Sequence, residues 1–152
     1  MQQNLISIVE LQPADLVLFK QLLSIFLEEF EHDSHLPEDD YLQELLEKPD
    51  FRVYTITKDD EVIGGLTLFV LDQYYQARPI GYIYDIAISQ AFQRKGFGKT
   101  LLNHVLQICK GQGFEDVFLQ AEQDDRQALS FYQSTLNHDE LLASQFTWSL
   151  NK

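Results

Sequence analysis

Apolar residues recur at helical spacing in four stretches of the chain, which predicts four helices. The first covers residues 16–30 behind Pro13, and the second lies between Pro37 and Pro49. The third, over residues 100–110, has a continuous apolar face and is followed closely by two glycines, which commonly end helices. A shorter fourth helix is expected to run to about residue 134, with Asp125 as its N-cap.

Short runs rich in β-branched and aromatic residues separate these helices and predict strands. They cover residues 6–11, 51–57, 62–71, 80–89, 117–121 and 141–150. The second and third runs flank a turn at residues 59–61, and the fourth is apolar enough for a central strand. Strands and helices in this order predict one α/β domain over residues 1–152, built on a mixed central sheet.

A glycine-containing loop connects the run at 80–89 to the helix at 100–110. Two glycines let a ligand approach the backbone closely, and the free N–H groups at a helix start favour an anion. Three bases in the same stretch add positive charge. The sequence therefore predicts a phosphate or pyrophosphate site formed by Gln93, Arg94, Lys95, Gly96, Phe97, Gly98, Lys99 and Thr100.

Two common nucleotide-binding loops do not fit this stretch. The spacing Gly-x-x-x-x-Gly-Lys-Ser/Thr of a Walker A loop is absent, and so is the Gly-x-Gly-x-x-Gly of a dinucleotide fold. A plain turn with a basic surface is the alternative interpretation. The preceding strand, the clustered bases and the amphipathic helix that follows favour the anion site.

The charge of the chain is strongly acidic and unevenly spread. There are 24 acids and 11 bases, which give a formal net charge of −13, and ten of the acids lie between Glu28 and Asp50. Such a surface repels nucleic acid and anionic membranes, so neither is expected as a partner. One basic spot indicates one anionic ligand, and the acidic clusters would suit a cationic co-substrate. For any single acid, a solvated surface is the alternative.

The sequence also bears on compartment and metal content. The single cysteine, Cys109, falls on an apolar helical face, so neither an intrachain disulfide nor an acyl-cysteine stage is expected. A signal peptide and a bilayer-spanning run are not recognised, and a cytoplasmic location is expected. No His, Cys and carboxylate spacing resembles a zinc site, so no metal is expected.

The loop Gln93-x-x-Gly96-x-Gly98 matches the Gln/Arg-x-x-Gly-x-Gly/Ala signature of the GNAT superfamily of acyl-CoA-dependent N-acetyltransferases. Residues 83–89, residues 120–122 and the pair Phe131-Tyr132 further resemble the type I aminoglycoside 3-N-acetyltransferases. The likeness runs in matching order over about residues 15–135. It implies a GNAT fold with a splayed strand pair, acetyl-CoA as cofactor, and a homodimer as a possible assembly.

The resemblance also implies roles for individual residues. The central strand of such enzymes pairs with the pantetheine arm of the cofactor, which points here to Ile86, Ala87 and Ile88. The pyrophosphate would lie on the N–H groups of residues 94–99. Tyr132 matches a tyrosine that often protonates the departing thiolate, and without this match it would be taken for a core residue.

Two carboxylates are candidates for the base or the ammonium-binding group. Asp85 lies among apolar neighbours, where an ionised carboxylate is costly unless it is paired, and this cost favours a function over a structural role. Glu122 ends the partner strand, and an ordinary exposed acid is an equally good interpretation. Further residues expected to contact the acceptor are Asp125, Glu28, Glu31 and Tyr84, the last of which is otherwise a packing residue.

These features predict direct acetyl transfer to a primary amine of a small polycation, with an aminoglycoside first and a polyamine second. Arg126 and Gln127 stand where an acid and a proline are expected in an aminoglycoside enzyme, which weakens the case for that substrate. A peptide or protein N-acetyltransferase is one alternative. A non-catalytic acyl-CoA-binding module is the other.

Overall fold

The computed structural model describes residues 5–33 and 35–151. Two compact units make up the chain, one ending at Gln120 and the other beginning at Ala121. The described elements in chain order are β1 (Ile6–Glu10), α1 (Leu16–Glu29), α2 (Asp39–Glu47), β2 (Phe51–Lys58), β3 (Glu61–Leu71), β4 (Ile80–Ile88), the 3-10 helix η1 (Gln90–Phe92), α3 (Phe97–Gly111), β5 (Val117–Phe118) and α4 (Arg126–Gln133).

The first unit is built on a five-stranded sheet with the order β1-β2-β3-β4-β5. The strands from β1 to β4 are antiparallel to their neighbours, and β5 runs parallel to β4. The turn between β2 and β3 places Asp59 and Asp60 at φ values of 49° and 68°, as tight hairpin turns require. The predicted mixed sheet and its hairpin are therefore confirmed.

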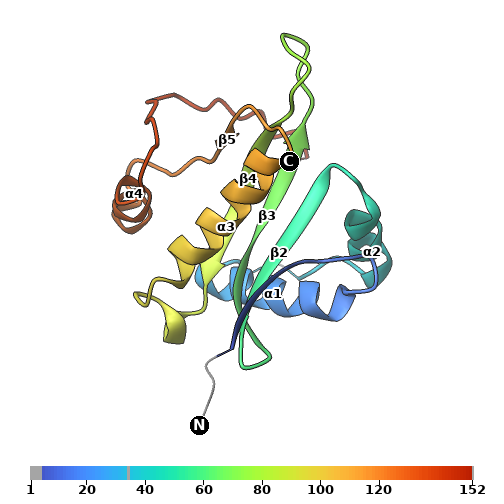
Figure 1. The fold of residues 1–152 in the computed structure, drawn as a ribbon. Coiled ribbons are helices and arrows are strands. Elements are labelled where there is room, and N and C mark those ends of the chain that lie inside the picture. The colour runs from blue at the N-terminus through green and yellow to red at the C-terminus, as the bar shows by residue number, and fades with distance from the viewer. Residues whose placement is uncertain (1–4, 34, 152) are drawn as a thin grey trace. The chain divides into compact units, whose positions relative to one another are not determined.

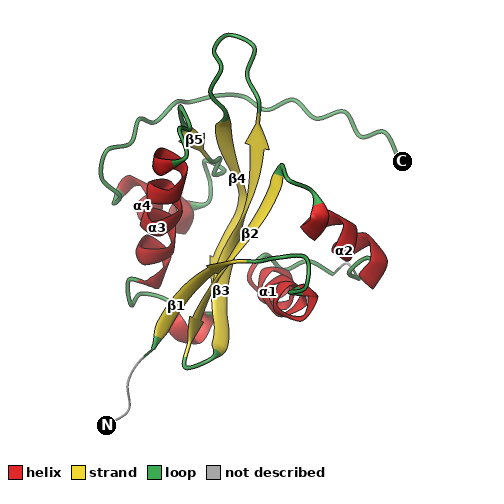
Figure 2. Ribbon diagram, turned by 45° about the vertical axis from the view of Figure 1, so that its right-hand side comes forward, coloured by secondary structure: helices red, strands yellow, loops and turns green. Residues whose placement is uncertain are grey.

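Helices cover both faces of this sheet, with α1 and α2 on one side and α3 on the other (Figures 1 and 2). On the first side Phe19, Leu22 and Phe26 of α1 belong to one buried cluster. On the other side Leu101 and Val105 of α3 belong to a second cluster and are fully buried. Burying an aliphatic or aromatic side chain of this size stabilises a fold by about 1.5–3 kcal/mol. The two cores therefore hold the helices on opposite faces of the strands.

The last two strands of the sheet separate soon after they meet. β4 pairs with β5 only at Gly81 with Val117 and at Tyr82 with Phe118. The Tyr82 ring stacks on Phe118 with 4.7 Å between centroids, and its hydroxyl donates to Gln120 Oε1 at 3.0 Å. Among the described residues, no strand pairs with positions 83–88 of β4 on the β5 side. The predicted splayed strand pair is confirmed.

The second unit contains α4 and a tail without regular structure. Asp125 Oδ1 accepts a hydrogen bond from the Ala128 N–H at 3.0 Å, so the predicted helix and its N-cap are confirmed. The strand predicted at residues 141–150 is wrong, because that segment has no regular secondary structure. A strand forms where its backbone groups pair with a neighbour, and no described segment pairs with residues 141–150. β5 likewise ends at Phe118, earlier than residue 121.

Candidate functional site

The loop after β4 ends in a left-handed turn that starts α3. Arg94 and Gly96 have φ values of 62° and 87°, and Gly96 is the N-cap of the helix. Glycine adopts this conformation without steric cost, which explains why position 96 is a glycine. α3 begins at Phe97 rather than at residue 100, so Gly98 lies in its first turn.

The backbone of this loop leaves a continuous row of hydrogen-bond donors. None of the N–H groups of residues 94–99 donates to a backbone carbonyl within the described part of the chain. The next N–H, that of Thr100, donates to Gly96 O at 3.0 Å, where the helical pattern begins. Unpaired N–H groups at a helix start bind anions, and the helix macrodipole adds to this attraction. The loop therefore fits a phosphate or pyrophosphate group.

Three basic side chains surround the same loop. Arg94, Lys95 and Lys99 are exposed, and the ion pairs found among the described residues involve none of them. The ammonium groups of Lys95 and Lys58 lie 5.8 Å and 5.7 Å from the ring centroid of Phe92. These charges are not neutralised by a carboxylate and can attract an anion.

Gln93 ties the loop to two other elements. Its side-chain amide donates to Ile88 O at the end of β4 and to Glu29 Oε2 at the end of α1, both at 2.8 Å. A glutamine amide has two donors, so both are used within the protein. The signature glutamine therefore fixes the loop against α1. The sequence could not indicate Glu29, because it lies 64 positions away.

The segment of β4 before the loop presents two different faces. Ile86 and Ile88 pack with the α3 core, whereas Ala87 packs with the α1 and α2 core. Its backbone lies along the stretch where β5 has separated from the sheet. An extended ligand could pair with this edge as a strand does. That the pantetheine arm does so at residues 86–88 stays a prediction.

Asp85 lies at an irregularity in β4. Thr67 pairs with Asp85 and Leu68 with Ile83, so Tyr84 is one residue extra on β4. The hydroxyl of Thr67 accepts a hydrogen bond from the Asp85 N–H at 3.2 Å. The Asp85 carboxylate is partly buried and makes no hydrogen bond or ion pair with the described residues. Burial raises the pKa of this carboxyl above its usual value, and the charge of His32 opposes the shift.

A pocket of about 220 Å³ lies between α1, α2 and the sheet, and Asp85 is part of its lining. Six of the thirteen lining residues are aromatic, among them Phe19 and Phe26 from α1 and Phe69 from β3. Tyr84 also lines it, is 62% exposed, and meets Phe69 edge-on at 5.9 Å. That Tyr84 contacts the acceptor stays a prediction. The sequence could not indicate the pocket, because the same aromatic spacing is typical of a filled core.

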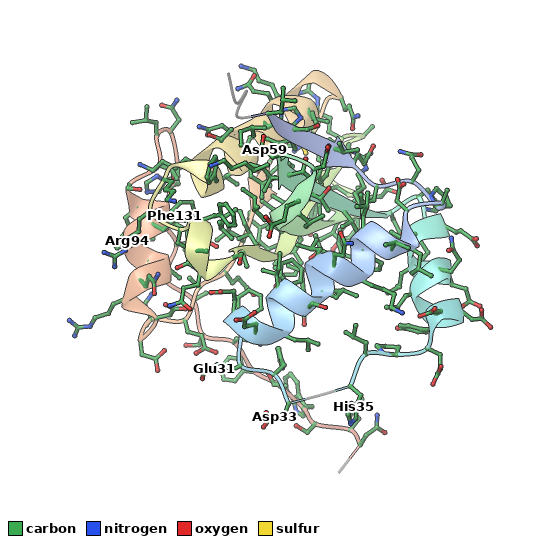
Figure 3. All side chains as sticks on the ribbon, turned by 90° about the horizontal axis from the view of Figure 1, so that it is seen from below. Glu31, Asp33, His35, Asp59, Arg94 and Phe131 are labelled. Carbon is green, nitrogen blue, oxygen red and sulfur yellow. The ribbon has the colours of Figure 1, made fainter. Side chains whose placement is uncertain are left out.

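The other predicted acceptor residues are spread over both units. Glu28 is exposed on the last turn of α1, and Glu31 follows the helix at a φ of 52° (Figure 3). Neither lines the pocket. Glu122 and Asp125 are exposed and belong to the second unit, where Asp125 caps α4. Their contact with an acceptor stays a prediction.

Tyr132 also belongs to the second unit. It lies on α4, is partly buried, and its ring meets that of Phe131 edge-on at 5.2 Å. Its predicted role in protonating a thiolate stays a prediction.

Cys109 is 1% exposed within the α3 core, and burial raises the pKa of its thiol. The expectation that it is a core residue is confirmed. In the part of the chain that the structure describes, no three His, Cys, Asp or Glu side chains gather in a way that could hold a metal ion. No described helix is long and apolar enough to cross a membrane.

Comparison with known proteins adds to this geometry. The acetyltransferase (GNAT) family model matches residues 19–137. Two crystal structures of an aminoglycoside acetyltransferase from an uncultured soil metagenomic sample superpose with a TM-score of 0.93. The one with trehalose is 38% identical and the one with sisomicin 37%, and each match covers 96% of this chain and 97% of that chain.

Curated relatives match over shorter stretches. N-alpha-acetyltransferase 50 of Danio rerio is 36% identical over 53 residues, which are 34% of this chain and 32% of that protein. The ribosomal protein bS18-alanine N-acetyltransferase of Salmonella typhimurium is 28% identical over 80 residues, 52% of this chain and 49% of that protein. The chain thus spans about a third of the length of the first of these curated relatives and about half of the second.

Proposed function

Because the chain belongs to the acetyltransferase (GNAT) family, whose members use acetyl-CoA, we propose that it transfers an acetyl group to a primary amine of a small polycationic acceptor, an aminoglycoside in the first place. The observation that carries the acetyl-CoA part is the row of unpaired N–H groups at residues 94–99, beside three exposed bases. This row lies within the family signature and at the start of α3, where an anion is favoured.

The proposed reaction needs few groups from the protein. Bound acetyl-CoA supplies the thioester carbonyl carbon, to which the amine nitrogen bonds as the carbon–sulfur bond breaks. The ammonium form of the acceptor must first lose a proton, so a carboxylate that binds it can also serve as base. The products are an acetamide and CoA, and one proton of the original ammonium is released to solvent.

Asp85 is the carboxylate we assign to this task. It lies two residues before Ala87 and, like Ala87, faces the side of the sheet covered by α1 and α2. Its carboxylate makes no hydrogen bond or ion pair with the described residues, so it can accept a hydrogen bond from an ammonium group. Partial burial strengthens that interaction, since fewer water molecules compete for the charge.

Two residues of the second unit complete the proposal. Tyr132 matches the family position from which a hydroxyl protonates the departing thiolate, and Glu122 is the second candidate for the base. Both assignments rest on the resemblance of the sequence. An oxyanion that forms at the carbonyl would be stabilised by backbone N–H groups of the central strand.

Two observations support an aminoglycoside as the acceptor. The chain is 37% identical, over nearly its whole length, to an aminoglycoside acetyltransferase whose crystal structure contains sisomicin. The net charge of −13, with ten acids between Glu28 and Asp50, also favours a polycation over a neutral acceptor. We further propose that acetylation inactivates such an antibiotic. A homodimeric assembly is proposed as well, from the family resemblance.

The experiment is a screen of purified protein with acetyl-CoA and a panel of amines, in which release of free thiol is followed. Sisomicin and spermidine represent the two polycations, and a reaction without acceptor measures background hydrolysis. We expect thiol release that depends on sisomicin and a product that carries one acetyl group by mass spectrometry. Thiol release that no amine accelerates would overturn the proposal. Expression in a susceptible bacterium should raise the sisomicin concentration needed to stop growth.

A further inference from the structure

The pocket beside Asp85 has a chemical character that a polycation does not explain. Among the described residues that line it, Asp85 alone carries a charge. Phe19, Phe26, Phe69 and Tyr84 form much of the remaining wall, and most of the rest consists of aliphatic side chains of α1, of α2 and of the segment before α2. A second ammonium group placed among these rings would lose its hydration without a partner, which is costly. The pocket therefore suits one positive charge next to an apolar group.

The dimensions of the pocket agree with this assignment. Its volume is about 220 Å³. An apolar cavity of about 150 Å³ already holds a benzene molecule. An aromatic ring or a branched alkyl chain can thus be accommodated while the adjoining ammonium remains at the carboxylate. The exposed ring of Tyr84 can add a cation–π contribution at the same point.

The Asp85 carboxylate lies both in the pocket and next to the strand edge where acetyl transfer is expected. Asp85 precedes residues 86–88 on β4, and its neighbour Thr67 on β3 also lines the pocket. An ammonium bound at Asp85 would therefore lie beside the strand edge along which the cofactor arm is expected. A substituent on the amine would point away from that edge, between α1 and α2.

We propose that this pocket is an acceptor subsite for an apolar substituent, so that a primary monoamine with an aromatic or branched alkyl group close to its nitrogen is acetylated by this chain. The inference rests on the acetyl transfer proposed above and extends it to a second class of acceptor. The bonds formed and broken are the same: carbon–nitrogen forms, carbon–sulfur breaks, and the ammonium proton is released. Asp85 holds the ammonium, and the aromatic wall holds the substituent.

The test compares 2-phenylethylamine with ethanolamine, which both carry one ammonium on a two-carbon chain and differ in the apolar group. Purified protein and acetyl-CoA are used, and kcat/KM is measured by thiol release. Discrimination of about tenfold or more is expected, since even one methylene in a fitted apolar pocket is worth about 10- to 200-fold. Equal kcat/KM values for the two amines would overturn the inference.

Variants that fill the pocket supply the second part of the test. Leu23→Trp on α1 and Leu45→Phe on α2 both enlarge a lining residue, and either suffices if the other does not fold. Each should lower the ratio of kcat/KM for 2-phenylethylamine to kcat/KM for ethanolamine by about tenfold or more. Val17→Trp is the matched control, because Val17 lies on the same helix, is 69% exposed and does not line the pocket. An unchanged preference in both pocket variants would place the apolar group elsewhere.

The acceptors also separate this inference from the proposed function. Turnover of sisomicin without turnover of 2-phenylethylamine would leave the polycation proposal intact and overturn the subsite. Turnover of 2-phenylethylamine without turnover of sisomicin would support the subsite and overturn the polycation proposal. If no amine is acetylated, the polycation proposal and the subsite are both overturned. Tripeptides that begin with Phe or with Ser are tested as acceptors in the same assay. A preference for the Phe peptide above 2-phenylethylamine would identify a peptide N-terminus, rather than a free amine, as the source of the apolar group.

Discussion

The carboxylate of Asp85 combines partial burial with the absence of a hydrogen-bonding partner among the described residues. An ionised carboxylate in such a place costs folding free energy, because water is removed and no donor replaces it. The raised pKa of the Asp85 carboxyl expresses the same cost, with burial as its main cause. A residue that serves only the fold would be expected to have a partner, so the arrangement favours a role in binding.

Replacement of this residue distinguishes the two roles. Asp85→Asn keeps the shape and removes the charge and the basicity, so we expect kcat/KM to fall by about 10²–10⁴-fold if the carboxylate is the base. The folded pKa is raised above the usual 3.8, so the folded protein binds more protons than the unfolded chain between these two values. The Asp85 carboxyl therefore adds to the free energy of unfolding at low pH, where it is protonated, and this contribution is lost as pH rises through the raised pKa.

The asparagine variant should consequently unfold at the same temperature as the wild type or a higher one at neutral pH. Melting temperature and kcat/KM measured on one preparation check both parts. Asp116→Asn is the control, because Asp116 is an exposed acid outside the pocket. A destabilised variant with full activity would assign Asp85 to the structure, and Glu122 would be tested next.

Tyr132 gives a second prediction at the scale of single residues. Tyr132→Phe removes the hydroxyl and keeps the ring that meets Phe131. If the hydroxyl protonates the thiolate, its interaction belongs to the transition state, so kcat should fall by about 10²–10⁴-fold with little change in KM. Steady-state kinetics with saturating acetyl-CoA measure this. A loss of kcat below about twofold, where chemistry limits the rate, would contradict the role.

At the scale of elements, most of the fold followed from the periodicity of apolar residues. α1, α2 and the hairpin β2–β3 lie close to their predicted bounds, because each has a strong amphipathic or β-branched pattern and local end signals. The tail at 141–150 has an equally good alternating pattern and yet forms no strand. Pattern describes which face of a strand would be buried, whereas pairing depends on a neighbour that the local sequence does not specify.

The sequence predicted the loop of the candidate site better than the pocket beside Asp85. The loop at 93–98 is local, so its glycines and bases indicated an anion site directly. The extra residue at Tyr84 and the bond from Gln93 to Glu29 depend on contacts between distant segments, and no local pattern encodes them. The pocket was not predicted for the same reason, because Phe19, Phe69 and Tyr84 are far apart in the sequence and come together only in the folded chain.

The two ends of α3 provide a matched test of the loop. Gly96 and Gly113 have φ values of 87° and 84°, and a Cβ added to either meets no atom within 4 Å. Aspartate in place of each should therefore have a similar backbone cost, about 1 kcal/mol. Only Gly96→Asp brings a negative charge to the unpaired N–H groups, so it alone should abolish acetyl-CoA binding measured by calorimetry. Normal affinity in a folded Gly96→Asp protein would place the pyrophosphate elsewhere.

At the scale of the whole molecule, charge sets the attraction between protein and acceptor. With a net charge of −13, the chain attracts a polycation from a distance and repels other anions. The exposed Glu28 and Glu31 contribute to this field without belonging to the pocket. Attraction of this kind extends over about a Debye length, which is about 30 Å at 0.01 M salt and about 8 Å at 0.15 M.

Raising the salt concentration should therefore raise KM most for the acceptors with the highest positive charge. Raising ionic strength between these limits screens the field, so KM for sisomicin should rise several-fold, KM for the doubly charged putrescine less, and KM for 2-phenylethylamine least. The value of kcat should change little, because the groups that react are in contact and are screened less. Measurements in potassium chloride, with sucrose added in a parallel series, separate charge screening from osmotic effects. A salt response of KM that is the same for all three amines would show that the acidic surface does not select the acceptor, and the case for a polycation would then rest on sequence similarity alone.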